Sequence, residues 1–170
     1  MIKIFYWSPF TSKVATVKSV INSAESLNRL FKKQYQTSII DAVHEWVNFK
    51  DEINEKKIEL IYLNKDSNFN SFKKVGFIRS RIAYFYIIFK SFFPLIKILK
   101  EKKPDFLIIH LITSLPLLLF TFKNFKTKLI LRISGLPKMT LFRKFLWKLA
   151  VKNIYKITCP TFDTYKNLSK

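Results

Sequence analysis

The sequence predicts an α/β fold, a Rossmann-like, doubly wound parallel sheet in a single domain. Short apolar or aromatic runs typical of buried strands alternate with longer stretches whose apolar residues recur at helical spacing. Such alternation implies parallel strands joined by right-handed crossovers. The 170 residues are enough for one domain with a core and short for two, so we expect residues 1–170 to form one domain.

Composition narrows the function classes. Hydrophobic residues make up 49% of the chain and aromatic residues 16%, unlike a disordered protein. Cys159 is the single cysteine and there are two histidines, so an internal disulfide and a Cys/His zinc site are excluded, and we expect no metal and no cofactor. The net charge of +20 accompanies abundant Lys, Asn, Ile and Phe, and no zinc finger, RNP-like motif or leucine heptad. We therefore expect no specific nucleic-acid partner.

The first half of the chain alternates as the fold class requires. Ile2–Trp7 is an apolar run expected to form a strand covered on both faces. A helix follows from Lys13, and strands are expected at Thr37–Val43 and Lys57–Leu63, joined by a surface connection or irregular helix at Asn48–Glu55. The apolar face of the first helix holds Val14, Val17, Ile21, Ala24 and Phe31. The amino terminus reads as a strand and not as an export signal, so we expect a protein in the cytoplasm or on its membrane face.

The central segment has two interpretations. Arg79–Lys103 is a long aromatic helix, and Phe106–Phe122 is uncharged and nearly long enough to cross a bilayer. The second stretch also fits a strand at Asp105–Leu111 followed by a turn and a helix from Leu115, with a proline near its first turn. We favour the strand and helix, and an integral hairpin with spans near Ile82–Leu99 and Phe106–Phe122 stays as an alternative.

The last third continues the alternation. Strands are expected at Lys126–Ser134 and Ile154–Cys159, a helix at Thr140–Lys152, and the start of another at Pro160–Lys170. The helix at Thr140–Lys152 has no acidic residue and sets four apolar residues against four cations: Phe142, Phe145, Leu146 and Leu149 against Arg143, Lys144, Lys148 and Lys152. Cations near an anionic surface attract it. We expect membrane contact through Arg143, Lys144 and Lys148.

Ligands of such sheets bind at the carboxyl ends of the strands. The loops expected there are Ser8–Lys13, Trp46, His110–Ser114, Ser134–Lys138 and Pro160–Thr161. The loop at Ser8–Lys13 has no glycine, which excludes a G-x-G-x-x-G dinucleotide-binding motif there. No G-x-x-x-x-G-K pattern occurs elsewhere, which excludes a P-loop.

The order of these stretches resembles the amino-terminal domain of family-4 glycosyltransferases, two-domain enzymes of the GT-B fold. The matching stretches are, in order, IKIFYWSP with VATVKSVINSAESL, then PDFLIIH, LILRISGLP and ITCPT. The resemblance covers essentially the whole chain, and because each motif is short it rests on their order and spacing. It implies the acceptor-side domain of such an enzyme.

The resemblance also implies site residues. Ser8, Ser12 and Lys13 match the loop that faces the acceptor, although the glycines usual there are missing. His110 matches a histidine that ends the fourth strand. We expect the three loop residues to bind the acceptor and His110 to be catalytic, with a core histidine bonded to backbone as the alternative.

A second loop matches less closely. Ser134 and Gly135 stand where the family often has His-Gly, so serine replaces the histidine. In relatives the histidine touches the donor sugar, and a serine can hydrogen-bond there without carrying charge. Arg132, two residues earlier, supplies charge only if its side chain reaches the loop. Ser134 and Arg132 are therefore expected to be catalytic, and Gly135 to bind the acceptor.

In the family the nucleotide sugar binds mainly to a second, carboxyl-terminal domain, which this sequence does not match. The resemblance thus implies a truncated or split enzyme, inactive without that domain, which meets a nucleotide-sugar donor only with a carboxyl-terminal domain or partner chain. The expected function is sugar transfer to a lipid-linked or other saccharide acceptor in surface polysaccharide synthesis, on the inner face of the cell membrane. The alternatives are a noncatalytic peripheral membrane or interaction module and the integral hairpin.

Overall fold

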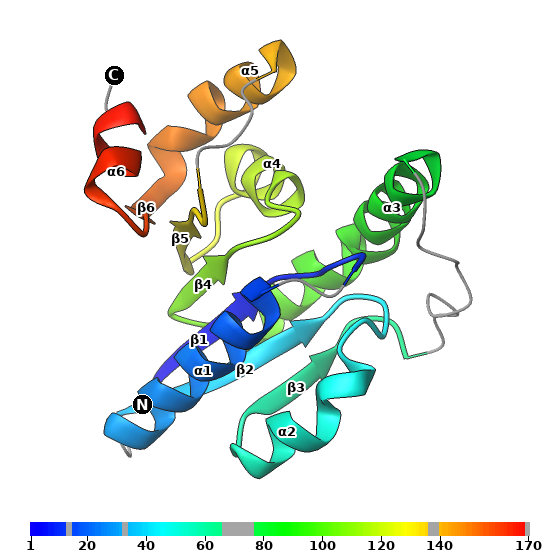
Figure 1. Cartoon of the computed structure of the whole chain (residues 1–170), viewed down its shortest axis with the longest axis vertical. Helices are drawn as coiled ribbons and strands as arrows, with labels where there is room; N and C mark the ends of the chain where they lie inside the picture. Colours follow the sequence, from blue (N-terminus) through cyan, green and yellow to red (C-terminus); the bar gives the residue numbers. More distant parts are fainter. Residues whose placement is uncertain (13–14, 32–33, 66–76, 136–139, 169–170) are drawn as a thin grey trace.

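The computed structural model describes residues 1–12, 15–31, 34–65, 77–135 and 140–168. Its centre is a sheet of six parallel strands in the order β3-β2-β1-β4-β5-β6 (Figure 1). The strands are β1 (Ile2–Trp7), β2 (Tyr35–Asp41), β3 (Glu59–Tyr62), β4 (Phe106–Ile109), β5 (Lys128–Arg132) and β6 (Ile154–Thr158). The α/β, Rossmann-like prediction is confirmed, because the order reverses direction between β1 and β4 as in a doubly wound sheet.

Helices cover the two faces of this sheet. They are α1 (Ala15–Leu30), α2 (Lys50–Glu55), α3 (Phe77–Lys102), α4 (Ser114–Phe122), α5 (Leu141–Ala150) and α6 (Phe162–Leu168), with short 3-10 turns at Val47–Phe49 and Val151–Asn153. Alternate residues of β1 divide the core, since Ile4 and Tyr6 join buried residues of α1 and α2, whereas Phe5 and Trp7 join those of α3 and α4. The strand expected at Thr37–Val43 is β2, which begins two residues earlier, at Tyr35, and ends two residues earlier, at Asp41.

The central segment forms a strand and a short helix. Phe106–Ile109 is strand β4, paired with β1 on one side and β5 on the other, and Ser114–Phe122 is the nine-residue helix α4. Pro116 lies in the first turn of α4, where its missing N–H group leaves no intrahelical bond unmade. The second span of the hairpin alternative is therefore wrong, because its residues form a strand, a turn and a short helix.

The long helix α3 has two distinct faces. Its buried residues recur at every fourth position: Ala83, Ile87, Ser91, Leu95 and Leu99. Its outer face exposes large apolar side chains at similar spacing: Ile82, Phe85, Phe89 and Phe93. By length and hydropathy (1.7), Ser80–Lys102 meets the criteria for a membrane span with 28% of the window buried, criteria that a core helix of a soluble protein also meets.

Two expected apolar faces are partly wrong. Phe31 follows the end of α1 and is 44% exposed, because the helix stops at Leu30 before the chain turns into β2. On α5 the side chains turned inward are Leu146 and Ala150, while Phe145 and Leu149 are exposed. The buried face of α5 is thus rotated about the helix axis from the expected one. Phe145 and Leu149 lie on the exposed side of the helix, together with Lys144 and Lys148.

Candidate functional site

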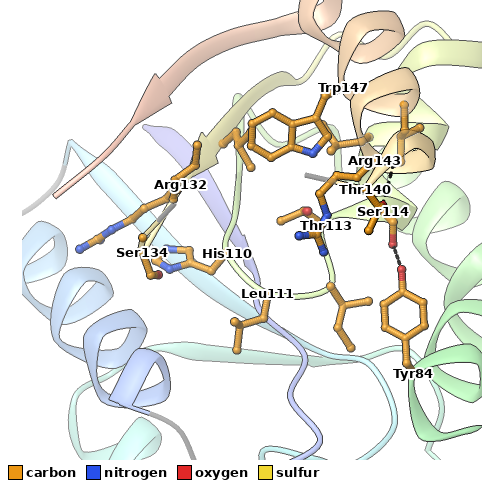
Figure 2. Close-up of a pocket in the computed structure, with 16 residues that line it drawn as sticks. Tyr84, His110, Leu111, Thr113, Ser114, Arg132, Ser134, Thr140, Arg143 and Trp147 are labelled. Carbon is orange, nitrogen blue, oxygen red and sulfur yellow. Dashed lines mark hydrogen bonds between the residues drawn. The ribbon is translucent and has the colours of Figure 1, made fainter. Parts of the chain in front are cut away.

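A pocket of about 500 Å³ lies beyond the carboxyl ends of β4 and β5 (Figure 2). The loop after β4 and the start of α4 form one wall, the loop after β5 forms another, and the first turns of α5 and Tyr84 of α3 complete it. The described lining residues with polar side chains are Tyr84, His110, Thr113, Ser114, Arg132, Ser134, Thr140, Arg143 and Trp147. None of the described lining residues is acidic.

His110 follows β4 directly and is 7% exposed. Its backbone N–H donates to the carbonyl oxygen of Trp7 at 3.0 Å, which continues the pairing of β4 with β1. Neither ring nitrogen has a hydrogen-bond partner among the described residues. Burial and the positive charge of Arg132 lower the pKa of His110 to about 4. The imidazole is therefore neutral at physiological pH, and the alternative of a backbone-bonded core histidine does not describe its side chain.

Ser134 and Gly135 line the same pocket as His110, as expected from their matching positions after adjacent strands. Both residues are exposed. A Cβ atom built on Gly135 would meet no atom within 4 Å, so close packing does not require a glycine at this position. The sequence thus predicted that the loops after β4 and β5 meet, because neighbouring parallel strands end at the same edge of the sheet.

Arg132 lies at the end of β5, but its guanidinium turns away from the centre of this pocket (Figure 2). Its Nη2 donates to the hydroxyl of Ser19 on α1 at 3.4 Å, and the side chain also lines a second pocket of about 610 Å³ on that face of the sheet. Strand alternation explains the direction, since Leu131 and Ile133 are buried toward the other face. Arg132 therefore acts on the main pocket through its charge, which lowers the pKa of His110.

The loop after β1 is divided between core and surface. Ser8 is fully buried, its hydroxyl has no partner among the described residues, and it lines neither this pocket nor its neighbour. Ser12 lines a smaller pocket of about 220 Å³, which shares Tyr84, Leu111 and Ile112 with the larger one. Ser12 is thus adjacent to His110 and Ser134 rather than in one pocket with them. Lys13 lies outside the described residues.

Several lining residues were not predicted from the sequence. Arg143, expected at a membrane, extends from the first turn of α5 into the pocket (Figure 2). Tyr84 of α3 bonds the hydroxyl of Ser114 at the start of α4. Trp7 Nε1 donates to the carbonyl oxygen of Ile112 at 3.1 Å and fixes the turn before α4. Helix-start signals at Thr113 and Thr140 were present in the sequence, but their meeting in space was not.

A pair of buried carboxyl groups lies elsewhere, at the carboxyl end of β2. Glu45 accepts hydrogen bonds from the backbone N–H groups of Ala42 (3.1 Å) and Val43 (2.7 Å). Burial and the neighbouring Asp41 raise the pKa of Glu45 well above its ordinary value, and burial raises that of Asp41. Both are at most 2% exposed, and Glu45 holds the turn after β2 through its two hydrogen bonds.

The described residues contain no group of three or more His, Cys, Asp or Glu side chains placed to hold a metal ion. The described part of the pocket lining therefore suggests no metal ligand set. What the site offers is one neutral imidazole, several hydroxyl groups and the cation of Arg143. Such groups bind hydroxylated or anionic ligands by hydrogen bonds and charge.

The sequence matches no protein-family model and no curated protein. Solved structures do match it. UDP-GlcNAc 2-epimerase from Neisseria meningitidis, bound to UDP-GlcNAc, is 17% identical with a TM-score of 0.62, over 99% of this chain and 43% of its own. MurG from Acinetobacter baumannii is 9% identical with a TM-score of 0.56, over 96% of this chain and 42% of its own.

A third solved structure, the glycosyltransferase SnogD from Streptomyces nogalater, is 7% identical with a TM-score of 0.57, over 94% of this chain and 44% of its own. The chain has a GT-B-like fold. It spans about two fifths of the length of these structures. At such low identity the likeness concerns the fold alone, so substrate and activity have to be argued from the site.

Proposed function

We propose that the chain is the acceptor-side part of a glycosyltransferase that moves a sugar from a nucleotide-sugar donor to a saccharide acceptor, one carried by a lipid in surface polysaccharide synthesis. The observation that carries the proposal is the meeting of His110, Ser134 and Gly135 in one pocket beyond the carboxyl ends of β4 and β5, beside the switch point between β1 and β4. Ligands of open α/β sheets bind outside the carboxyl ends of the strands, close to such a switch point. The pocket is large enough for a sugar residue.

The site chemistry suits an acceptor hydroxyl. A neutral His110 accepts a hydrogen bond from a sugar hydroxyl, and Ser134 both donates and accepts one. Both side chains line the pocket, so a hydroxyl bound there is positioned without any change of charge at physiological pH. Positioning of reactants supplies a large part of the rate acceleration in transfer reactions. The donor's diphosphate is held by a further domain or partner chain in this proposal, as the share of the similar structures left uncovered suggests.

Saccharide binding and transfer test this proposal together. Saturation-transfer NMR on the purified chain should show contact with acceptor saccharides, and His110→Ala and Ser134→Ala should each weaken it. Lys148→Gln, an exposed change outside the pocket, is the matched control. The chain alone should transfer no sugar from UDP-GlcNAc to a lipid-linked saccharide. Transfer by the chain alone would refute the half-enzyme proposal, and epimerisation of UDP-GlcNAc would assign a different reaction.

A second proposal is contact with an anionic membrane surface, and two surfaces support it. α3 exposes Phe85, Phe89 and Phe93, and α5 exposes Phe145 and Leu149 among its lysines. Apolar side chains beside cations bind at an anionic interface, with roughly 1 kcal/mol from each cation near the surface. In this proposal the protein is cytoplasmic and peripheral on the inner face of the cell membrane. Lys144 and Lys148 are the cations placed for this role.

Vesicle sedimentation tests the membrane proposal. We expect binding to vesicles that contain phosphatidylglycerol, weakened by salt and by the double change Lys144→Gln and Lys148→Gln. Phe89→Ser should weaken it independently of salt. Binding to neutral phosphatidylcholine vesicles alone, indifferent to both changes, would contradict it.

A further inference from the structure

Two helices begin in the wall of the main pocket. Thr113 and Ser114 at the start of α4 and Thr140 before α5 all line it. α4 has nine residues and α5 has ten, so each presents the positive end of its dipole and N–H groups in its first turn, those of Ser114 and Leu115 in α4, where Pro116 has none. Thr113 makes no side-chain capping bond, whereas Thr140 Oγ1 accepts one from the N–H of Arg143 at 3.3 Å. Both helix ends favour an anion in the space between them.

The charged side chains among the described lining residues are both cations, Arg132 and Arg143. Arg143 extends from the first turn of α5 into the pocket between the two helix ends (Figure 2). No described lining residue is acidic. A guanidinium beside helix N-termini is a strong donor set for phosphate oxygens.

His110 supplies an independent sign of a ligand. It lines the pocket, is 7% exposed, and both of its ring nitrogens are without a partner among the described residues. A buried polar group without a hydrogen bond is costly, by about 1–3 kcal/mol. A ligand oxygen that accepts from the neutral ring would satisfy one of these nitrogens.

From these observations we propose that the pocket binds a phosphate or diphosphate group, held by Arg143 and by the N-termini of α4 and α5. The pocket of about 500 Å³ exceeds a diphosphate, so the ligand carries a further group, which lies toward His110 and Ser134. The inference rests on the proposed function and deepens it, because it makes the acceptor a phosphate-linked saccharide. It reassigns Arg143 from the membrane to this site.

Inorganic pyrophosphate is the probe. In an NMR titration of ¹⁵N-labelled protein at about 0.15 M salt, which screens diffuse surface attraction, we expect the amide signals of Ser114, Leu115 and Leu141 to shift. Arg143→Gln should weaken the affinity about tenfold, as expected for the loss of a charge-assisted hydrogen bond. Gly135→Asp should abolish binding, because it adds a carboxylate where a Cβ has open space.

Matched controls separate the site from the general charge of the protein. Lys148→Gln removes one cation from the same helix at an exposed position outside the pocket and should keep wild-type affinity. Gly135→Ala adds a side chain at the same place as Gly135→Asp without the charge, so it should weaken binding far less than Gly135→Asp does. Equal weakening by Lys148→Gln and Arg143→Gln, or no shift with pyrophosphate, would overturn the proposal.

Vesicles separate the sources of the phosphate. If Arg143→Gln weakens pyrophosphate binding and leaves phosphatidylglycerol vesicle binding unchanged, the phosphate belongs to a ligand within the pocket. If both fall together, a lipid headgroup occupies the same anion site. Either result supports the anion site, and neither requires sugar transfer, so this inference and the proposed function can fail separately.

Discussion

Single side chains of this protein take their properties from burial more than from sequence neighbours. His110 and Arg132 are far apart in sequence and come from adjacent strands, and the cation adds to burial in lowering the pKa of the imidazole. Asp41 and Glu45 show the opposite effect, because burial and mutual repulsion raise the pKa of Glu45. Neither effect is visible in the sequence, where the same residues are separate polar positions.

The first prediction concerns His110 and acid. Its pKa is about 4 in the folded protein and about 6.5 when unfolded, so the unfolded state binds more protons between these values. The free energy of unfolding should therefore fall as pH is lowered from about 6.5 to about 4, by at most about 3 kcal/mol from this group. Urea unfolding of wild type and His110→Gln across this range measures it. Parallel pH profiles for the two proteins would contradict the prediction.

The second prediction concerns Glu45. Its folded pKa is raised, so its stabilising contribution is lost as pH rises through that pKa. Glu45→Gln removes this loss and keeps an acceptor for Val43 but leaves the N–H of Ala42 without one, so we expect it to be less stable than wild type at low pH and to gain on wild type as pH rises. Glu45→Ala should lose about 1–3 kcal/mol, because two backbone N–H groups lose their acceptor. A stability difference between the Gln variant and wild type that stays the same at all pH values would refute this account.

At the scale of elements, helix α3 combines a buried face with an exposed apolar face. Its inward residues recur at every fourth position along the core, and its outward phenylalanines face away from it. Periodicity in the sequence showed that this segment is helical, but almost every position is apolar, so the pattern could not tell the inner stripe from the outer one.

Paired truncations on α3 make the third prediction. Ile87→Ala should cost about 2–5 kcal/mol of unfolding free energy, because it leaves a cavity in the core. Phe89→Ala, two residues on, should change stability by about 0.5 kcal/mol or less, since its ring is 76% exposed. Chemical denaturation of the two purified variants compares them. A large loss from Phe89→Ala would show that another surface covers the outer stripe.

Much of the fold was predictable because strand and helix patterns are local. Ile2–Trp7 was placed to the residue, and Phe106–Ile109 lies within the strand expected from Asp105. The site was only half predictable. His110 and Ser134 follow strands, so the edge of the sheet brings them together. Arg143 and Tyr84 enter from helices whose rotation depends on tertiary packing. Ser8 directly follows β1 and is buried with it, which its polar side chain did not indicate.

At the scale of the whole molecule, the sheet is unevenly covered. β1 and β4 are central and flanked on both sides, whereas β3 and β6 are its edges. β6 alternates little between buried and exposed positions, with Tyr155 and Ile157 exposed, and it borders the pocket of about 610 Å³ beside α1. Strand stability should therefore fall from the centre of the sheet toward β6.

The last prediction tests this gradient by hydrogen exchange on the purified chain. Amides exchange by local opening, and opening is easier where few apolar contacts are lost. We expect the amides of Tyr6, Trp7 and Ile109 to exchange most slowly, near the rate set by global unfolding, and those of Tyr155 and Ile157 much faster. Protection of β6 equal to that of β1, and lost on dilution, would mean instead that a second copy covers this edge, since association shifts apparent stability with concentration.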